Sequence, residues 1–251
     1  MKSITLTELA LAIGGTLDGN GDIAITGSAS LEEATATDVS FLANDRYRKF
    51  MTETAAGAVI VTSDYDGPGE SLIRCDDPYF AFRNALVELY GWRKHPFTGI
   101  SPQAAIDPAA TVSPEAHIGP FVTVSAGATV GAGTVLYSGT FIGANAVVGD
   151  DCICHANVSI YDHCVLGDRV TVHANSSIGQ DGFGYATHDA AHHKIPTTGN
   201  VILGDDVEIG ACCAIDRATL GSTTLGAGTK LSNHISIGHG SKMGKHCLMV
   251  A

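Results

Sequence analysis

An aliphatic side chain returns at every sixth position from Ile100 to Ile178, with Cys154 as the one exception. The positions between are Ile106, Val112, Ile118, Val124, Val130, Leu136, Ile142, Val148, Ile160, Leu166 and Val172. This period fits neither an amphipathic helix nor the alternation of a half-buried strand. It is typical of short parallel strands joined by turns, three to a coil of about 18 residues, stacked at roughly 4.8 Å. The sequence therefore predicts a mainly β fold, a parallel β helix of hexapeptide repeats.

Two further positions of the hexad support this prediction. Two residues before each aliphatic position lies a small or β-branched residue, such as Thr134 or Cys152, which fits beside a bulky side chain in a narrow prism. The residue after the aliphatic one is often glycine, as at Gly131 and Gly149, which predicts a tight corner with positive φ. A β sandwich is the alternative, but sandwiches do not hold one register for so long.

The ladder is interrupted once, and we expect an external loop at about residues 179–200. The pattern then resumes through Leu203, Ile209, Ile215, a slip at Leu220 and Leu225, Leu231, Ile237, Met243 and Met249. The loop contains Asp, His, Lys and aromatic residues. Long loops of this composition are where function is expected, although a solvated insertion is the simpler alternative.

Residues 1–97 lack the six-residue period and are predicted to form a separate small α/β domain, followed by the β-helix domain at 98–251. Thr5 and Glu8 have capping-box spacing ahead of a short apolar helix. Asp77 followed by proline is typical of the start of a second helix.

Composition excludes several classes of function. The chain has 251 residues and a net charge of −12, which argues against a nucleic-acid or anionic-membrane partner. No long apolar run predicts a membrane span or a secretion signal, so we expect a cytoplasmic protein. The seven cysteines include no Cys-x-x-Cys pair, which favours reduced core thiols over a metal site or a disulfide framework.

Four segments carry a resemblance to a known family. They are Ile178-Gly179-Gln180-Asp181-Gly182-Phe183-Gly184-Tyr185, Val207-Glu208-Ile209-Gly210-Ala211 with Ile215-Asp216-Arg217 after it, Ile237-Gly238-His239-Gly240, and Phe41-x-x-Asn44-x-x-Tyr47. With the hexapeptide ladder they resemble the UDP-3-O-acylglucosamine N-acyltransferases of lipid A biosynthesis, over nearly the whole chain. The resemblance implies a left-handed β helix and no cofactor. It also implies transfer of a 3-hydroxyacyl group from acyl carrier protein to the 2-amino group of a UDP-3-O-(3-hydroxyacyl)glucosamine.

The resemblance assigns His239 as the catalytic base. A sugar ammonium is not nucleophilic, so the reaction needs a group with a pKa near neutrality to remove a proton, and histidine fits that demand. In the family, position 232 is usually an acid that orients the base, whereas this chain has Ser232. Asn233 follows it and is the candidate supporting residue.

The resemblance assigns Phe41, Asn44 and Tyr47 to the uracil ring. A flat neutral base is held by stacking on aromatic rings, and an amide can both donate to and accept from its edge. Without the resemblance, Phe41 and Tyr47 are better explained as core residues of a small domain. Two alternative sets of loop side chains are candidates to face the sugar or the diphosphate. One is Gln180, Asp181, Phe183 and Tyr185, and the other is His192, His193 and Lys194.

Tyr137, His155 and His173 are 18 residues apart and are predicted to stack along one edge of the coils. Stacked imidazoles could bind zinc, which motivates an alternative, a β-helical enzyme of the γ-carbonic anhydrase type. A third ligand expected about five residues after His173 is absent, because position 178 is isoleucine. Aromatic stacking alone is the simpler interpretation. A non-catalytic repeat scaffold is a further alternative that leaves His239 without a purpose.

Two expectations concern the chain's end and its assembly. The family continues with further coils and a helical part, so we expect a chain truncated at its C-terminus. On that basis the oxyanion-hole amide and the segment that docks the carrier protein lie after Ala251, and the chain binds its substrate without turning it over. The flat faces of a triangular prism, and the closed trimers of related β helices, predict a homotrimer.

Overall fold

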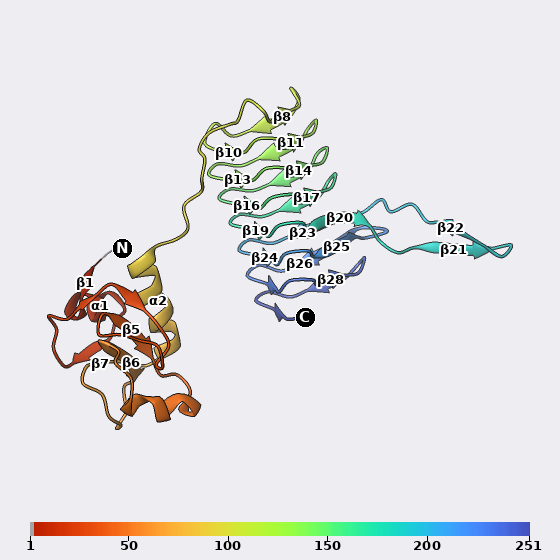
Figure 1. Ribbon diagram of the computed structural model, residues 1–251. Coiled ribbons are helices and arrows are strands. Elements are labelled where there is room, and N and C mark those ends of the chain that lie inside the picture. Colours follow the sequence, from red (N-terminus) through yellow and green to blue (C-terminus); the bar gives the residue numbers. More distant parts are fainter. Residues whose placement is uncertain (1–2) are drawn as a thin grey trace. The chain divides into compact units, whose positions relative to one another are not determined.

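The computed structural model describes residues 3–251 and divides the chain into two compact units, which meet in the sequence at Lys94 and His95. The first is a small α/β unit and the second is a stack of coils with parallel strands (Figure 1). The parallel β helix predicted from the six-residue period is confirmed.

The first unit is built on a five-stranded sheet of order β2-β7-β6-β5-β4, in which only β2 is antiparallel to its neighbour. A separate pair of antiparallel strands joins β1 to β3. The elements are β1 (Ile4–Thr5), α1 (Leu6–Ala12), β2 (Thr16–Asp18), β3 (Ala24–Ile25), β4 (Gly27–Ser28), β5 (Asp38–Phe41), the 3-10 helix η1 (Asp45–Thr52), β6 (Ala58–Thr62), β7 (Leu72–Cys75) and α2 (Pro78–Tyr90).

Both helix starts predicted in this unit are confirmed. The Thr5 side chain accepts from the Glu8 N–H at 3.3 Å, and the Glu8 carboxylate accepts from the Thr5 N–H at 2.9 Å, which completes the capping box of α1. Asp77 caps α2 by accepting from the N–H of Phe80 at 3.0 Å.

The second unit consists of three seven-stranded parallel sheets. The first contains β8 (Ala105–Ile106), β11 (Thr123–Val124), β14 (Phe141–Ile142), β17 (Ser159–Ile160), β20 (Ser177–Asp181), β25 (Ala214–Arg217) and β28 (Ser236–Ile237). The second contains β9 (Thr111–Val112), β12 (Thr129–Val130), β15 (Val147–Val148), β18 (Val165–Leu166), β23 (Asn200–Leu203), β26 (Ser222–Leu225) and β29 (Lys242–Met243). The third contains β10 (His117–Ile118), β13 (Val135–Leu136), β16 (Ile153–Cys154), β19 (Thr171–Val172), β24 (Glu208–Ile209), β27 (Lys230–Leu231) and β30 (Leu248–Met249).

The aliphatic ladder forms the core of this unit. Pairing of Val124 with Ile142 and of Ile142 with Ile160 shows the 18-residue coil directly. The small position of the hexad is buried as well. Thr134 is fully buried and satisfies its hydroxyl by donating to the Gly149 carbonyl at 2.7 Å, in the next coil.

The corners differ from the sequence prediction in one respect. The glycine after the aliphatic residue does not have positive φ within the regular coils; positive φ falls two residues later, at residues such as Asp151 (φ 54°) and Asn157 (φ 60°). Gly149 is needed for space instead, because a Cβ there would lie 2.5 Å from the Gly167 carbonyl oxygen of the next coil. The prediction of positive φ at this glycine was therefore wrong.

The structure also differs from the sequence prediction at Leu220 and Leu225, where the six-residue pattern slips by one residue. Leu225 points into the core, but Leu220 is 82% exposed and takes no ladder position. Four residues, 218–221, lie between β25 and β26; Ala218 is buried, and Leu220 and Gly221 are exposed at the corner. Because a leucine happens to fall near the repeat spacing, the sequence pattern included it in the core.

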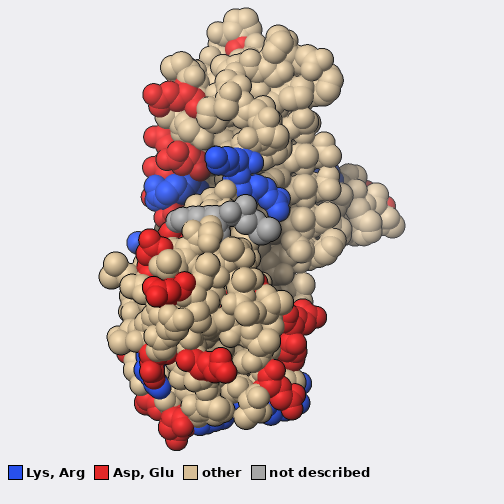
Figure 2. Space-filling model, turned by 60° about the vertical axis from the view of Figure 1, so that its left-hand side comes forward, with Lys and Arg blue, Asp and Glu red and all other residues tan. Residues whose placement is uncertain are grey.

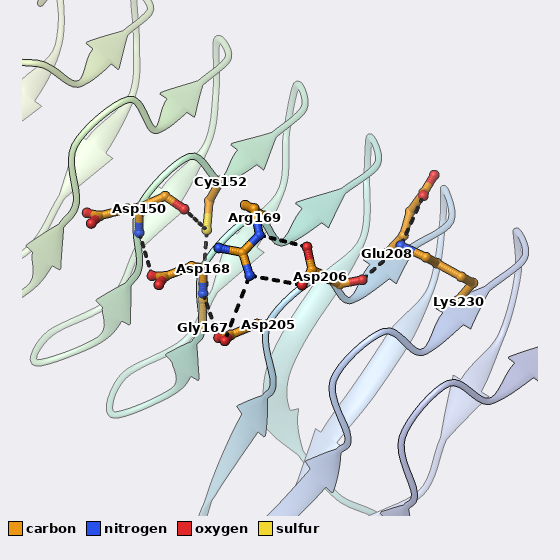
Figure 3. A network of polar contacts seen from close by, with 9 residues as sticks. All are labelled: Asp150, Cys152, Gly167, Asp168, Arg169, Asp205, Asp206, Glu208 and Lys230. Carbon is orange, nitrogen blue, oxygen red and sulfur yellow. Dashed lines mark hydrogen bonds and ion pairs between the residues drawn. The ribbon is translucent and has the colours of Figure 1, made fainter. Parts of the chain in front are cut away.

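One corner carries a ladder of carboxylates across successive coils (Figure 3). Asp168 accepts from the N–H of Asp150 at 2.9 Å, and Asp205 accepts from the N–H of Asp168 at 3.0 Å. Beside them, Arg169 forms two hydrogen bonds to Asp206, at 2.8 and 2.9 Å. The Asp168 and Asp205 carboxylates thus satisfy backbone N–H groups at this corner, whereas Arg169 and Asp206 pair with each other.

In the view of Figure 2, Asp and Glu side chains lie in separate groups with fewer Lys and Arg among them, and broad areas of the surface carry no charge. Within residues 3–251, the helices are all too short or too polar to cross a lipid bilayer.

The coil register predicts which thiols react. Burial raises the pKa of the Cys152 thiol to about 11, and Cys154 is fully buried. Cys212 is exposed on a corner. Since the thiolate is the reactive form, we expect iodoacetamide at pH 8 to alkylate Cys212 in the folded protein while Cys152 and Cys154 react only after denaturation, as measured by peptide mass spectrometry. Rapid labelling of Cys154 in the native state would contradict the observed register.

Candidate active site

The chain leaves the coils at the end of β20 and returns at β23. Between them, β21 (Tyr185–His188) and β22 (Ala191–Lys194) form an antiparallel hairpin that projects from the stack of coils (Figure 1). Every residue of the two hairpin strands is exposed. An isolated two-stranded hairpin has little stability of its own, so the contacts at its base decide how it is held.

A buried arginine anchors the root of this loop. Arg217 is 6% exposed and donates to the Gly179 carbonyl at 2.6 Å. Its other nitrogens donate to the carboxylate and the carbonyl of Asp162, at 2.8 and 3.0 Å. The hydrogen bond from Arg217 holds the pKa of Asp162 below its usual value. Next along the chain, Gln180 donates to the Asp216 carboxylate at 2.8 Å.

Asp181 and Lys194 form a second set of contacts beyond the root. The Thr197 hydroxyl donates to one oxygen of Asp181, and Lys194 Nζ lies 3.3 Å from the other. The Thr197 bond, with a smaller contribution from Lys194, lowers the pKa of Asp181. Lys194 Nζ also donates to the Gly182 carbonyl at 3.0 Å and lies 5.6 Å from the centre of the Tyr185 ring. Asp181, Tyr185 and Lys194, from both predicted sets, thus belong to one cluster.

Phe183 touches that cluster only through the Tyr185 ring. Its side chain is 84% exposed, and its ring contacts Tyr185 edge-on with 5.1 Å between centroids. His192 and His193 lie on the exposed strand of the hairpin. Of the aromatic loop residues, Phe183 is therefore the one with most of its surface open to a bound molecule.

His239 follows β28 and is exposed. Its imidazole takes part in no hydrogen bond or ion pair with residues 3–251, so both ring nitrogens are open. The loop contacts His239 through Gly182. A Cβ atom added to Gly182 would lie 2.6 Å from His239 Cβ and 2.9 Å from Cγ. The structure therefore brings the loop motif and His239 together. Asn233 accepts from the Ala211 N–H at 2.8 Å, so its support of His239 stays a prediction.

A second candidate site is a cavity of about 560 Å³ in the first unit. Phe41, Asn44 and Tyr47 all line it, together with Ser30, Leu31, Glu32, Ser40, Ala43 and Tyr79. Phe41 stacks on Phe82 with 4.3 Å between ring centroids, and this contact holds the Phe41 ring in place. The Asn44 oxygen caps η1 by accepting from the Arg46 N–H at 3.0 Å.

Sequence reasoning missed two residues of this cavity. Ser40 is 1% exposed, and its hydroxyl has no hydrogen-bond partner within the described part of the chain. Tyr79 belongs to α2 and reaches the cavity from far along the sequence, with its ring 5.7 Å from that of Phe41. No spacing signal linked Tyr79 to the motif, whereas Ser40 could have been noticed as a polar residue at the end of a buried strand.

The predicted ring ladder on the edge of the coils is confirmed. The Tyr137 and His155 rings lie 5.1 Å apart, and the His155 and His173 rings stack almost parallel at 4.8 Å. His173 Nε2 lies 3.2 Å from the Glu208 carboxylate. Over residues 3–251, no three His, Cys, Asp or Glu side chains are grouped so that they could hold a metal ion.

Residues 145–180, which form part of the coils, match the family model of bacterial transferase hexapeptides, and this match places the coils in the hexapeptide-repeat class of transferases. Residues 22–87, which contain Phe41, Asn44 and Tyr47, match the model of UDP-3-O-(3-hydroxymyristoyl) glucosamine N-acyltransferase, LpxD.

The curated relatives extend this match to nearly the whole chain. The UDP-3-O-acylglucosamine N-acyltransferase of Syntrophotalea carbinolica is 48% identical over 98% of this chain and 72% of its own length. That of Pseudomonas aeruginosa is 43% identical over 99% of this chain and 70% of its own. The chain belongs to the family of UDP-3-O-acylglucosamine N-acyltransferases. These matches do not favour the carbonic anhydrase alternative, and they give the chain an enzyme family in place of a scaffold role.

Among solved structures, the Arabidopsis UDP-N-acetylglucosamine acyltransferase is similar over 60% of this chain and 57% of that chain, with 17% identity and a TM-score of 0.48.

Proposed function

We propose that the protein transfers a 3-hydroxyacyl group from acyl carrier protein to the 2-amino group of UDP-3-O-(3-hydroxyacyl)glucosamine, with His239 as the base. The amine attacks the thioester carbonyl, the new C–N bond forms, and the C–S bond breaks to release the carrier thiol. The imidazole accepts the proton that the amine loses and returns it to the leaving sulfur. The observation that carries this proposal is the exposed His239 ring, with both nitrogens open, beside the loop motif of the family.

The cavity of the first unit is proposed to hold the uracil ring. Phe41, Tyr47 and Tyr79 all line the cavity and supply its aromatic surface. The buried Ser40 hydroxyl is an additional polar group that could read the edge of the base, since a buried hydroxyl without a partner is costly. The loop residues Gln180, Asp181, Phe183 and Tyr185 are proposed to serve the sugar end of the substrate, with Phe183 in direct contact.

We propose that the protein acts as a homotrimer in the cytoplasm. In support, the outward positions of the second sheet carry no charge over several coils, as at Thr129, Val147, Val165 and Ile202. An uncharged flat face of this kind suits contact with another copy of the chain. Light scattering of the purified protein tests the assembly, and a monomer at micromolar concentration would contradict it.

The function is tested by an acyl-transfer assay with UDP-3-O-acylglucosamine and 3-hydroxyacyl carrier protein, using mass spectrometry to detect the UDP-2,3-diacylglucosamine. The assay is run on this sequence and on the chain extended to the length of its relatives, because this sequence covers 72% of one of them. Absence of product from the extended chain would overturn the proposal.

Replacing Phe41 by alanine is expected to weaken UDP binding about tenfold, because loss of aromatic stacking costs about 0.5–1.5 kcal/mol in addition to the lost contact area. Calorimetric titration with UDP measures this change on the present chain. Phe80→Ala is the matched control, since Phe80 is exposed on α2 but does not line the cavity. Equal UDP affinity in Phe41→Ala, Tyr47→Ala and Phe80→Ala would place the uracil site elsewhere.

A further inference from the structure

We propose that Lys194 and Gly182 act together as a positioning device for His239: Lys194 holds the Gly182 peptide against the imidazole and thereby limits the ring's orientation. The inference rests on the proposed function in so far as it takes His239 to be the base. This role requires no contact of either residue with the substrate, although Lys194 belongs to one of the two loop sets considered for the sugar and the diphosphate.

The first step is the contact between Gly182 and His239. Gly182 is buried although its neighbours Asp181 and Phe183 are exposed. A Cβ on Gly182 would lie 2.6 Å from His239 Cβ and 2.9 Å from Cγ, which is closer than such atoms approach in real structures, and it would lie 3.0 Å from Cδ2. Its φ is not positive. Glycine is therefore needed here for space, and the space it leaves is filled by the histidine side chain.

The second step is what holds Gly182 in that place. Lys194 Nζ donates to the Gly182 carbonyl at 3.0 Å and lies 3.3 Å from the Asp181 carboxylate. Asp181 is in turn bound by the Thr197 hydroxyl. Lys194 is the one Lys or Arg in the loop sequence 179–200. The Lys194 ammonium thus links β22, the second strand of the hairpin, to the carbonyl of Gly182, the residue that lies against the His239 side chain.

The third step connects position to rate. Proton removal requires the accepting nitrogen to lie within hydrogen-bond reach of the amine. No side chain in the described chain hydrogen-bonds the His239 ring, so the Gly182 contact limits its rotation in place of an orienting carboxylate. A displacement of about 1 Å at a reacting group can lower the rate about a hundredfold. Loss of the contact should therefore reduce kcat more than it changes KM.

The experiment compares Gly182→Ala with Gly184→Ala. Gly184 is two residues away, and a Cβ there would meet only Ile195 Cβ at an ordinary 3.7 Å. On the 251-residue chain, we expect Gly182→Ala to shift the His239 imidazole NMR signals and Gly184→Ala to leave them in place. In the extended chain, we expect Gly182→Ala to lower kcat about 10- to 100-fold with KM for the nucleotide sugar within about twofold.

Lys194 is tested by removal and by rescue. Lys194→Met removes the donor to the Gly182 carbonyl and should shift the same NMR signals and lower kcat. Lys194→Arg keeps an N–H donor and a positive charge, so it should restore part of the loss. A role in overall stability would lower the melting temperature in the Met variant without this selective effect on kcat and on the His239 signals.

The two proposals fail in different ways. Unchanged His239 signals in both Gly182→Ala and Lys194→Met would overturn the positioning role, whatever the activity. Normal turnover in His239→Ala would overturn the assignment of the base, and the NMR comparison would still report whether the loop orients the ring.

Discussion

Replacement of His239 by alanine is expected to lower acyl-transfer turnover by at least about a hundredfold, because general-base catalysis contributes about 10² to 10⁴ in rate. The affinity for the nucleotide sugar should change little, since the imidazole accepts a proton only as the amine attacks. Steady-state kinetics on the chain extended to the length of its relatives, together with UDP titration, measures both quantities.

The control for this variant is His188→Ala. His188 is exposed at the end of β21, and within residues 3–251 its imidazole forms only an exposed ion pair with Asp189, so its removal should leave turnover unchanged. A turnover in His239→Ala equal to that of His188→Ala would mean that another group removes the proton.

Replacement of Arg217 by methionine is expected to lower the free energy of unfolding by about 2–4 kcal/mol. Methionine has a similar length but no donor, so the carbonyls of the buried Gly179 and the half-buried Asp162 would lose their partners, and the Gly179 carbonyl accounts for most of the loss. Each buried polar group left without a hydrogen bond costs about 1–3 kcal/mol. Urea unfolding monitored by circular dichroism measures the loss. The root of the loop should also become sensitive to protease in the native state.

Arg169→Met is the matched control for this effect. Arg169 makes equally short bonds to Asp206, but its side chain is 51% exposed, as is that of Asp206. Exposed ion pairs contribute about 0–1 kcal/mol, so this variant should unfold close to the wild-type urea concentration. If both arginine variants unfolded at the same concentration of urea, burial of Arg217 would not be the source of its contribution.

Much of the fold could be predicted because each six-residue repeat contains the residue types that indicate its own strand and turn. Val124, Ile142 and Ile160 occupy the same position of the six-residue repeat, and each points inward. In a stack of parallel coils, equivalent positions lie 18 residues apart, so the same local pattern predicts all three. The capping box of Thr5 and Glu8 and the cap at Asp77 are likewise local, and both were predicted. The corner glycines were predicted in position but not in role, since the carbonyl that excludes a Cβ at Gly149 comes from the next coil.

The candidate sites were less accessible to sequence reasoning. The Phe41, Asn44 and Tyr47 motif and His239 were identified by resemblance, and the structure shows the first three around one cavity. Tyr79 was missed because α2 brings it there from a distant part of the chain. Leu220 was placed in the core because spacing alone cannot distinguish a ladder position from a corner insertion.

The sequence by itself determined the coiled architecture, the break in the ladder and the family, because these depend on residue types at regular or short spacings. Only the tertiary structure decided that Arg217 anchors the loop at Gly179, that Lys194 holds the Gly182 carbonyl, and that Gly182 lies against His239. Each of these contacts joins residues from different coils or from the two ends of the loop. The distances in these contacts depend on how the coils stack and on where β22 leads the chain back to the coils. Neither can be predicted from a local sequence pattern.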